Sequence, residues 1–109
     1  MIKIIPKESE IQASVCDYLS WKKHFFWRSN NLPVFDKSGG FFRRMPLHAK
    51  KGVPDVILVR NGGKVCFLEI KRPGGKLSVE QQIFKNECER LKAEYHVITD
   101  LDQVIKLGL

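Results

Sequence analysis

The chain has 109 residues, of which 43% are hydrophobic and 28% charged, which is the balance of an ordinary folded protein. That length suits a single domain over residues 1–109 with one hydrophobic core, and leaves no room for a second domain. No apolar run approaches the roughly 18 residues that span a membrane, and the opening MIKIIPKESE lacks the apolar core of a signal peptide. We therefore expect a cytoplasmic protein with no membrane partner.

The formal net charge of +7 favours a polyanionic partner, because Lys and Arg bind phosphates and release counterions. The three cysteines are widely spaced, with no C-x-x-C and no nearby Cys/His pair, so reduced thiols packed as small hydrophobes are favoured over a zinc site. Composition thus points towards nucleic acid and away from a disulfide or zinc scaffold.

The first predicted element is a helix from Pro6 to about Lys23, since residues 11, 15 and 19 are apolar at helical spacing. Glu8 and Gln12 lie on or beside that apolar face. Glu10 lies nearer the polar side of the helix, so Glu8 is the better placed of the two glutamates to point inward.

A strand over 25–28 follows, and the signals from 30 to 54 are those of a loop or irregular hairpin. A loop this long is usually functional or mobile, and here five cations face a single acid among aromatic rings. Such a mixture suits a loop that binds a DNA backbone. A solvated loop whose phenylalanines pack into the core would have the same composition. The residues concerned are Phe35, Lys37, Phe41, Phe42, Arg43, Arg44, His48, Lys50 and Lys51, of which His48 reads more simply as a surface histidine.

Two apolar runs, 55–59 and 64–71, are joined by Asn61-Gly62-Gly63, which is a hairpin signal. Both runs are apolar on both faces, which predicts central, covered strands. A second helix opens at 77–81, where Ser78 and Gln81 have the spacing of a capping box, and its predicted buried stripe consists of Ile83, Phe84, Cys88 and Leu91.

A short strand over 95–99 and a closing helix over 101–107, capped by Asp100, complete the chain. The predicted order is α-β-β-β-α-β-α. This order indicates an α/β or α+β fold in which helices flank a mixed sheet.

Glu69 and Lys71 are two residues apart on a predicted strand, so their side chains leave the same face. Such charges must pair, reach solvent at the strand end, or hold a metal and substrate. The hairpin could bring Asp55 near Glu69, and two adjoining carboxylates repel unless a divalent cation lies between them. Hard oxygen ligands favour Mg²⁺ or Mn²⁺, with Lys71 orienting water and neutralising phosphate.

Gly52-Val53-Pro54-Asp55, thirteen residues, and then Glu69-Ile70-Lys71 resemble the PD-(D/E)XK nuclease signature, and more narrowly that of the VRR-NUC family. The resemblance covers nearly the whole chain. It includes Glu8-x-x-x-Gln12, Trp27-Arg28, Arg43-Arg44, Lys51-Gly52-Val53-Pro54-Asp55 and Leu77-Ser78-x-x-Gln81.

The resemblance implies a restriction-endonuclease-like fold and Mg²⁺- or Mn²⁺-dependent cleavage of branched or flapped DNA. Small stand-alone members are typical of phages and prophages, so action in the host cytoplasm is expected, with Holliday junction resolution by a homodimer as one form of it. Residue by residue, it implies that Asp55, Glu69 and the Ile70 carbonyl bind metal, that Lys71 serves water and phosphate, and that Gln81 and Glu8 complete the site. The residues expected to bind DNA are Arg28, Lys37, Arg43, Arg44, His48, Lys50, Lys51 and Arg72.

Each residue taken singly has an ordinary explanation: Asp55 as a turn former, Glu69 and Lys71 as an exposed ion pair, Gln81 as a capping partner. Motif order, strand placement and same-face spacing together favour the nuclease. The alternatives are a non-catalytic DNA-binding or accessory module of phage DNA metabolism, and a basic protein that assembles with other proteins.

Overall fold

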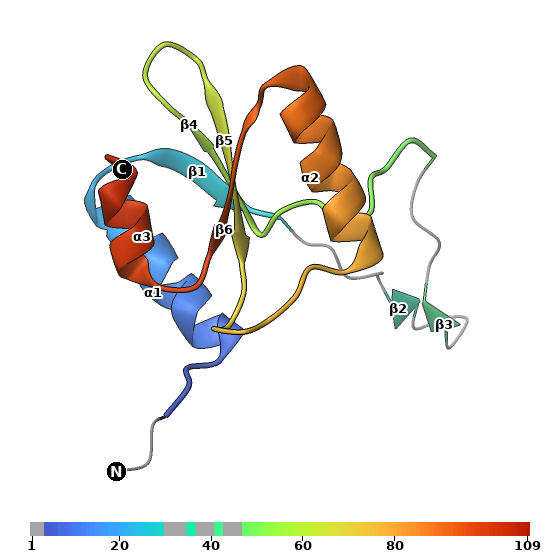
Figure 1. The fold of residues 1–109 in the computed structure, drawn as a ribbon, viewed down its shortest axis with the longest axis horizontal. Helices are drawn as coiled ribbons and strands as arrows, with labels where there is room; N and C mark the ends of the chain where they lie inside the picture. The colour runs from blue at the N-terminus through green and yellow to red at the C-terminus, as the bar shows by residue number, and fades with distance from the viewer. Residues whose placement is uncertain (1–3, 30–34, 37–40, 43–46) are drawn as a thin grey trace.

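The computed structural model describes residues 4–29, 35–36, 41–42 and 47–109. A four-stranded sheet lies between helices: α1 and α3 cover one face, and α2 lies against the other (Figure 1). The elements, in chain order, are α1 (Glu8–Trp21), β1 (Phe25–Arg28), β2 (Phe35–Asp36), β3 (Phe41–Phe42), β4 (Val56–Val59), β5 (Val65–Ile70), α2 (Val79–Leu91), β6 (Glu94–Ile98) and α3 (Leu101–Lys106).

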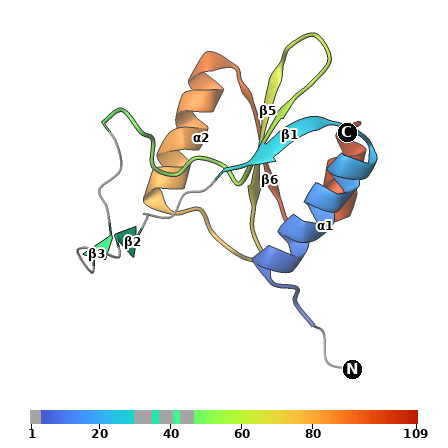
Figure 2. The same cartoon turned by 180° about the vertical axis from the view of Figure 1, so that it is seen from behind.

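The main sheet has the strand order β1-β4-β5-β6. β4 pairs antiparallel with both β1 and β5, whereas β5 and β6 run parallel with α2 as the crossover between them. A parallel pair needs such a connection, and an antiparallel pair needs only the turn that Gly62 and Gly63 supply with positive φ. The sheet is therefore mixed, as predicted, and seen from behind β1 forms its outer edge (Figure 2).

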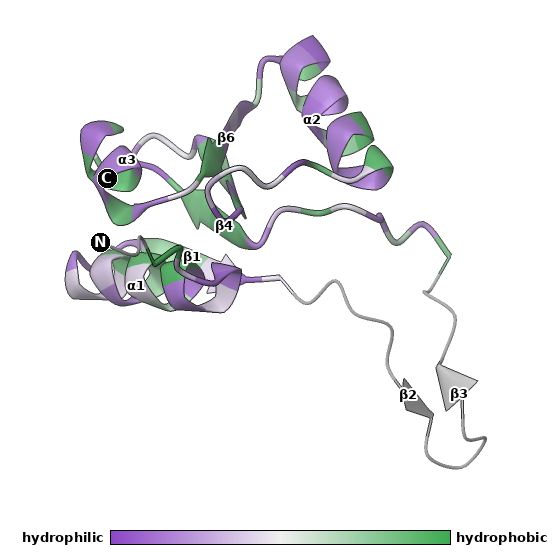
Figure 3. Ribbon diagram, turned by 60° about the horizontal axis from the view of Figure 1, so that its bottom comes forward, coloured by the Kyte–Doolittle hydropathy of each residue, from purple (hydrophilic) through white to green (hydrophobic). Residues whose placement is uncertain are grey.

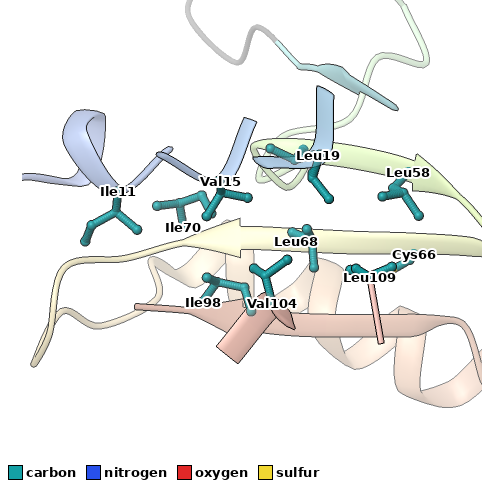
Figure 4. Close-up of a cluster of buried hydrophobic side chains, with 11 residues drawn as sticks. Ile11, Val15, Leu19, Leu58, Cys66, Leu68, Ile70, Ile98, Val104 and Leu109 are labelled. Carbon is teal, nitrogen blue, oxygen red and sulfur yellow. The ribbon is translucent and has the colours of Figure 1, made fainter. Parts of the chain in front are cut away.

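The main core lies between this sheet and the α1/α3 layer (Figure 4). Ile11, Val15 and Leu19 of α1 pack on the side chains that β4 and β5 turn towards the helix. Full burial of a Leu or Val side chain contributes about 1.5–3 kcal/mol, so this layer supplies much of the fold's stability. The sheet and C-terminal members of the cluster are Val56, Leu58, Cys66, Leu68, Ile70, Ile98, Val104 and Leu109.

The opposite face of the sheet is covered less completely. Helix α2 packs on β6, with Phe84 edge-on to Phe67 at 5.3 Å between ring centroids. Val65, at the far end of β5, is 39% exposed. The prediction that both hairpin strands are covered on both faces is therefore wrong for this face, because α2 packs on β6 at one edge of the sheet and lies away from β1 at the other (Figure 3).

The element bounds agree closely with the sequence predictions. Helix α1 is shorter at both ends than the predicted 6–23, because Lys7 has extended φ and ψ and Lys23 has a positive φ of 62°. Within 30–54, predicted as a loop or irregular hairpin, β2 and β3 form a small antiparallel pair in which Phe35 pairs with Phe42 and Asp36 with Phe41. Among the described residues no helix is long and apolar enough to span a membrane.

Candidate active site

Asp55 lies where β4 begins, directly after the buried Pro54. The backbone here is fixed from the side of β1: the Ser29 amide donates to the Asp55 carbonyl at 2.9 Å, and the Ser29 hydroxyl donates to the Pro54 carbonyl at 2.5 Å. The pairing of β1 with β4 thus continues one step beyond the strand and holds the Asp55 backbone in place.

The hairpin brings Asp55 and Glu69 together. Val56 pairs with Leu68, so the register continued by one residue sets Asp55 opposite Glu69. The Ile70 amide donates to Asp55 Oδ2 at 2.8 Å, which bonds the aspartate to the same short stretch of β5. Alternation along β5 places Glu69 and Lys71 on the face that carries α2.

Glu69 is the charged side chain that the described part of the fold buries most deeply, at 1% exposure. The side-chain Nε2 of Gln81 donates to Glu69 Oε1 at 2.6 Å, while Glu69 Oε2 is buried and has no hydrogen-bond partner among the described residues. A buried carboxylate oxygen without a partner is costly unless something else binds it. The fold therefore leaves one acceptor of Glu69 available beside Asp55.

Gln81 reaches Glu69 because the start of α2 is held in place twice. Ser78 and Gln81 form the predicted capping box. The Ser78 backbone N–H donates to Gln81 Oε1 at 2.8 Å, and the Gln81 backbone N–H donates to Ser78 Oγ at 3.2 Å. Gln81 thus caps the helix with its oxygen and supports Glu69 with its nitrogen.

Gly52 makes the second contact that holds the start of α2 in place. It has a φ of +71°, and a Cβ on it would lie 2.5 Å from the carbonyl carbon and oxygen of Glu80. Only glycine lets the segment before Asp55 approach the first turn of α2 this closely. The Gly52-Val53-Pro54-Asp55 motif therefore has a packing role as well as a chemical one.

Helix α1 brings a third acid towards the pair. The negative charge of Glu8 raises the pKa of both Asp55 and Glu69, which places it on the site's side of the helix. Glu10 instead lines a shallow hollow next to Thr99 and Leu101. Both glutamates are exposed, and the assignment of Glu8 to the site stays a prediction.

Arg28 lies at the β1 edge of the site. With the Gln12 amide oxygen turned towards it, that oxygen accepts hydrogen bonds from Arg28 Nε at 2.7 Å and Nη2 at 3.1 Å. The positive charge of Arg28 also lowers the pKa of Asp55. Gln12, which the sequence placed beside the apolar face, therefore holds a cation at the margin of the acidic pair.

Burial dominates the electrostatics of both carboxyls. It raises the pKa of Glu69 to about 8, with the neighbouring charge of Asp55 adding to the rise and Lys71 opposing it. Burial also raises the pKa of Asp55, against the hydrogen bond from the Ile70 amide. Two close carboxylates whose charged forms are disfavoured make a site that gains from a cation.

The donor set fits a hard divalent cation. Asp55 and Glu69 offer carboxylate oxygens from adjoining strand ends, and no described residue forms a hydrogen bond with Glu69 Oε2. Oxygen ligands from one or two carboxylates, with the remaining positions left to water and phosphate, suit Mg²⁺ or Mn²⁺. Asp55, Glu69 and the Ile70 carbonyl are the groups that would hold it.

The predicted DNA-binding residues divide into two sets. Lys37, Arg43 and Arg44 lie outside the described residues. Of the others, His48 is exposed with a positive φ of 69°, and Arg28, Lys50, Lys51 and Arg72 are also exposed. Lys50 and Lys51 border a hollow of about 360 Å³ beside Phe67 and α2.

A second polar cluster escaped the sequence analysis. Cys66, Glu94 and His96 offer ligand atoms within 4.8 Å of one another, although no close Cys/His pair stands in the sequence. Parallel pairing sets Cys66 opposite Glu94 on the α1/α3 face, away from Asp55 and Glu69. The sequence indicates this cluster only indirectly, because Cys66 and Glu94 are seen to be neighbours only when β6 is known to pair with β5.

Hydrogen bonds within the protein already occupy this second cluster. Arg60 Nε and Nη2 donate to the two Glu94 oxygens at 2.8 Å each, and His96 Nε2 lies 2.8 Å from Glu94 Oε2. Burial raises the pKa of the Cys66 thiol to about 12, so it stays protonated. The arrangement is that of a structural ion-pair network, in which Arg60 already neutralises the charge of Glu94.

Comparison with known proteins agrees with the fold and the motif. The model of the VRR-NUC domain family matches residues 3–99. No curated protein matches the chain. A solved structure described as a VRR_NUC domain superposes with a TM-score of 0.64 at 16% identity, over 94% of this chain and 95% of that one. With Asp55, Glu69 and Lys71 at adjoining strand ends and the family model spanning most of the sequence, the chain belongs to the VRR-NUC family of nuclease domains.

Proposed function

We propose that the protein is a metal-dependent DNA endonuclease that hydrolyses phosphodiester bonds at the Asp55–Glu69 site. The observation that carries the proposal is the buried Glu69 Oε2 beside Asp55, which has no hydrogen-bond partner in the described part of the chain, with Gln81 and Lys71 close by. A structural ion pair would satisfy both carboxylate oxygens, and this arrangement leaves one available. The site lies at the strand ends, where β4 begins and β5 ends.

The residues of the chain divide the work of hydrolysis. Bound Mg²⁺ or Mn²⁺ would supply Lewis-acid stabilisation of the phosphate and lower the pKa of a water. Asp55 is held for this purpose by the Ile70 amide, and Glu69 by Gln81. Lys71 leaves the same strand face as Glu69, where an ammonium can orient the attacking water and neutralise charge on the phosphate. Glu8 approaches from α1 and completes the acidic set.

We further propose that the substrate is branched or flapped DNA and that the active form is a homodimer. The family supports the first, and the symmetric incision of a junction by a small protein would require the second. The net charge of +7 and the exposed cations Lys50, Lys51 and Arg72 support DNA as the partner.

The decisive experiment is cleavage of labelled four-way junction, flap and linear duplex DNA by the parent protein and by Asp55→Asn, with Mg²⁺, Mn²⁺ or EDTA. Asparagine can still accept from the Ile70 amide, so the fold should persist while cutting falls by about three orders of magnitude. Metal-dependent cutting that survives in Asp55→Asn would contradict the site. DNA binding by folded parent protein with no cutting in either metal would instead establish the non-catalytic module.

A further inference from the structure

The face of the sheet on which α2 packs carries two exposed aromatic side chains beside the acidic pair, at the β1 edge that α2 leaves uncovered. On β1, Phe26 packs on the α1/α3 core, so Phe25 and Trp27 leave the opposite face. Phe25 is 69% exposed and Trp27 is 45% exposed. Their rings contact each other, with centroids 5.7 Å apart and planes tilted by 50°. Two large rings are thus held against each other at the surface instead of filling the core.

The register places Trp27 next to the candidate active site. Trp27 pairs with Ile57, and Asp55 lies two residues before Ile57 on the same face. Diagonal neighbours across an antiparallel pair are about 7–8 Å apart. A stacked DNA strand advances about 3.4 Å per nucleotide, so this separation corresponds to about two nucleotides.

A cation continues the same row beyond the rings. Phe25 pairs with Val59, and both line a hollow of about 390 Å³ at the end of the sheet, whose wall also includes Lys23, Arg60 and the C-terminal Leu109. Lys23 is exposed at the turn between α1 and β1. The face therefore offers, in order, two carboxylates, two aromatic rings and an ammonium. That order suits a polyanion with flat apolar groups better than it suits a second apolar protein surface.

We infer that Trp27 and Phe25 form a stacking platform for unpaired bases of the DNA strand whose phosphate lies at Asp55 and Glu69. The inference rests on the proposed function and narrows its substrate to DNA with unpaired nucleotides next to the cut. Stacking on an aromatic ring tolerates any base, because every base has a flat face. Paired bases keep their faces buried within the duplex and gain nothing from the platform. The rings thus select for the structure of the DNA and not for its sequence.

The chain offers a matched control, because it has two tryptophans and both are exposed. Trp21 lies at the end of α1, in the layer that covers the opposite face of the sheet from Trp27, and its ring contacts Tyr18. Binding would be measured in EDTA, where nothing is cut, with a duplex bearing an oligothymidylate flap and with the same duplex fully paired. The variants are Trp27→Ala, Trp27→Phe and Trp21→Ala, each checked for folding by circular dichroism.

Trp27→Ala should weaken binding of the flap by at least about fivefold and binding of the paired duplex by less than about twofold. Trp27→Phe should keep most of the affinity, and Trp21→Ala all of it. In a Trp21→Phe background, the flap should quench the emission of Trp27. Equal losses on flap and duplex, or no loss on either, would overturn the platform.

Two further outcomes separate this inference from its alternatives. Were Trp27→Ala to turn a dimeric parent into a monomer in sedimentation, the face would be an interface between copies and the platform would be wrong. Cleavage by the parent is scored in a separate assay with metal. Flap-selective binding through Trp27 without cleavage would uphold the platform and reject the nuclease, whereas cleavage without such binding would do the reverse.

Discussion

The side-chain amide of Gln81 donates to Glu69 Oε1 at 2.6 Å while its oxygen accepts from the Ser78 amide at 2.8 Å. A single glutamine thus joins the start of α2 to the most deeply buried carboxyl described in the protein. Each bond restricts the rotamer that the other needs, so the helix cap and the candidate metal ligand are positioned together.

This coupling can be separated by two substitutions. Gln81→Ala removes both roles and should lower the cleavage rate by about 10- to 100-fold at limiting Mn²⁺, because it frees Glu69. Ser78→Ala removes only the cap and should cost about 1 kcal/mol of stability with little change in cleavage. The measurements are cleavage rates over a Mn²⁺ titration and urea unfolding. Equal activity losses in the two variants would assign Gln81 a purely structural role.

The raised pKa of Glu69 predicts how stability depends on pH in the absence of metal. Between its ordinary pKa of 4.5 and its folded value of about 8, the folded state holds a proton that the unfolded state has lost. The free energy of unfolding should therefore fall as pH rises through this window, by up to about 1.4 kcal/mol per pH unit.

Glu69→Gln should remove that dependence, since the amide does not titrate. Urea unfolding in EDTA at intervals from pH 5 to pH 8 measures both slopes. Parallel slopes for the parent and the variant would show that Glu69 is charged in the folded protein at neutral pH. In the parent, added Mg²⁺ should reduce the decrease in the free energy of unfolding with rising pH, because the cation replaces the proton on Glu69.

Gly52 predicts a substitution that harms the fold and the site together. Gly52→Ala adds a Cβ that would overlap the Glu80 carbonyl, at a φ of +71° that alanine rarely adopts. We expect a loss of about 2 kcal/mol or more, together with reduced cleavage as the start of α2 shifts. Gly62→Ala is the control, because its φ is +88° but a Cβ there would meet no described residue within 4 Å, so a loss of about 1 kcal/mol is expected. Thermal unfolding measures the loss of stability in each variant. A similar loss in both would show that the contact of Gly52 with α2 does not contribute to stability.

The Arg60–Glu94–His96 network should support stability without affecting cleavage. Arg60→Ala leaves the half-buried Glu94 without its bidentate partner, and about 1–2 kcal/mol should be lost. Lys106→Ala breaks an exposed pair with Asp102 and should leave the stability nearly unchanged. Urea unfolding and the flap-cleavage assay give the comparison. A large loss of cleavage in Arg60→Ala would connect this end of the sheet to the active site.

Much of the candidate site followed from local rules of the chain. Alternation along a strand put Glu69 and Lys71 on one face, and the Asn61-Gly62-Gly63 turn fixed the register that sets Asp55 opposite Glu69. The Ser78–Gln81 spacing predicted the capping box that is present. These features need only neighbours in the sequence, so their geometry is set by backbone periodicity and turn chemistry.

Contacts between distant segments were decided only by the tertiary structure. The bond from Gln81 to Glu69, the approach of Gly52 to α2 and the pairing of Gln12 with Arg28 depend on how helices dock on the sheet, which no spacing encodes. The same holds for the face that leaves Trp27 exposed, because α2 packs on β6, at the edge of the sheet opposite β1. The sequence by itself determined which groups face together along each element, and packing between elements decided which of them meet.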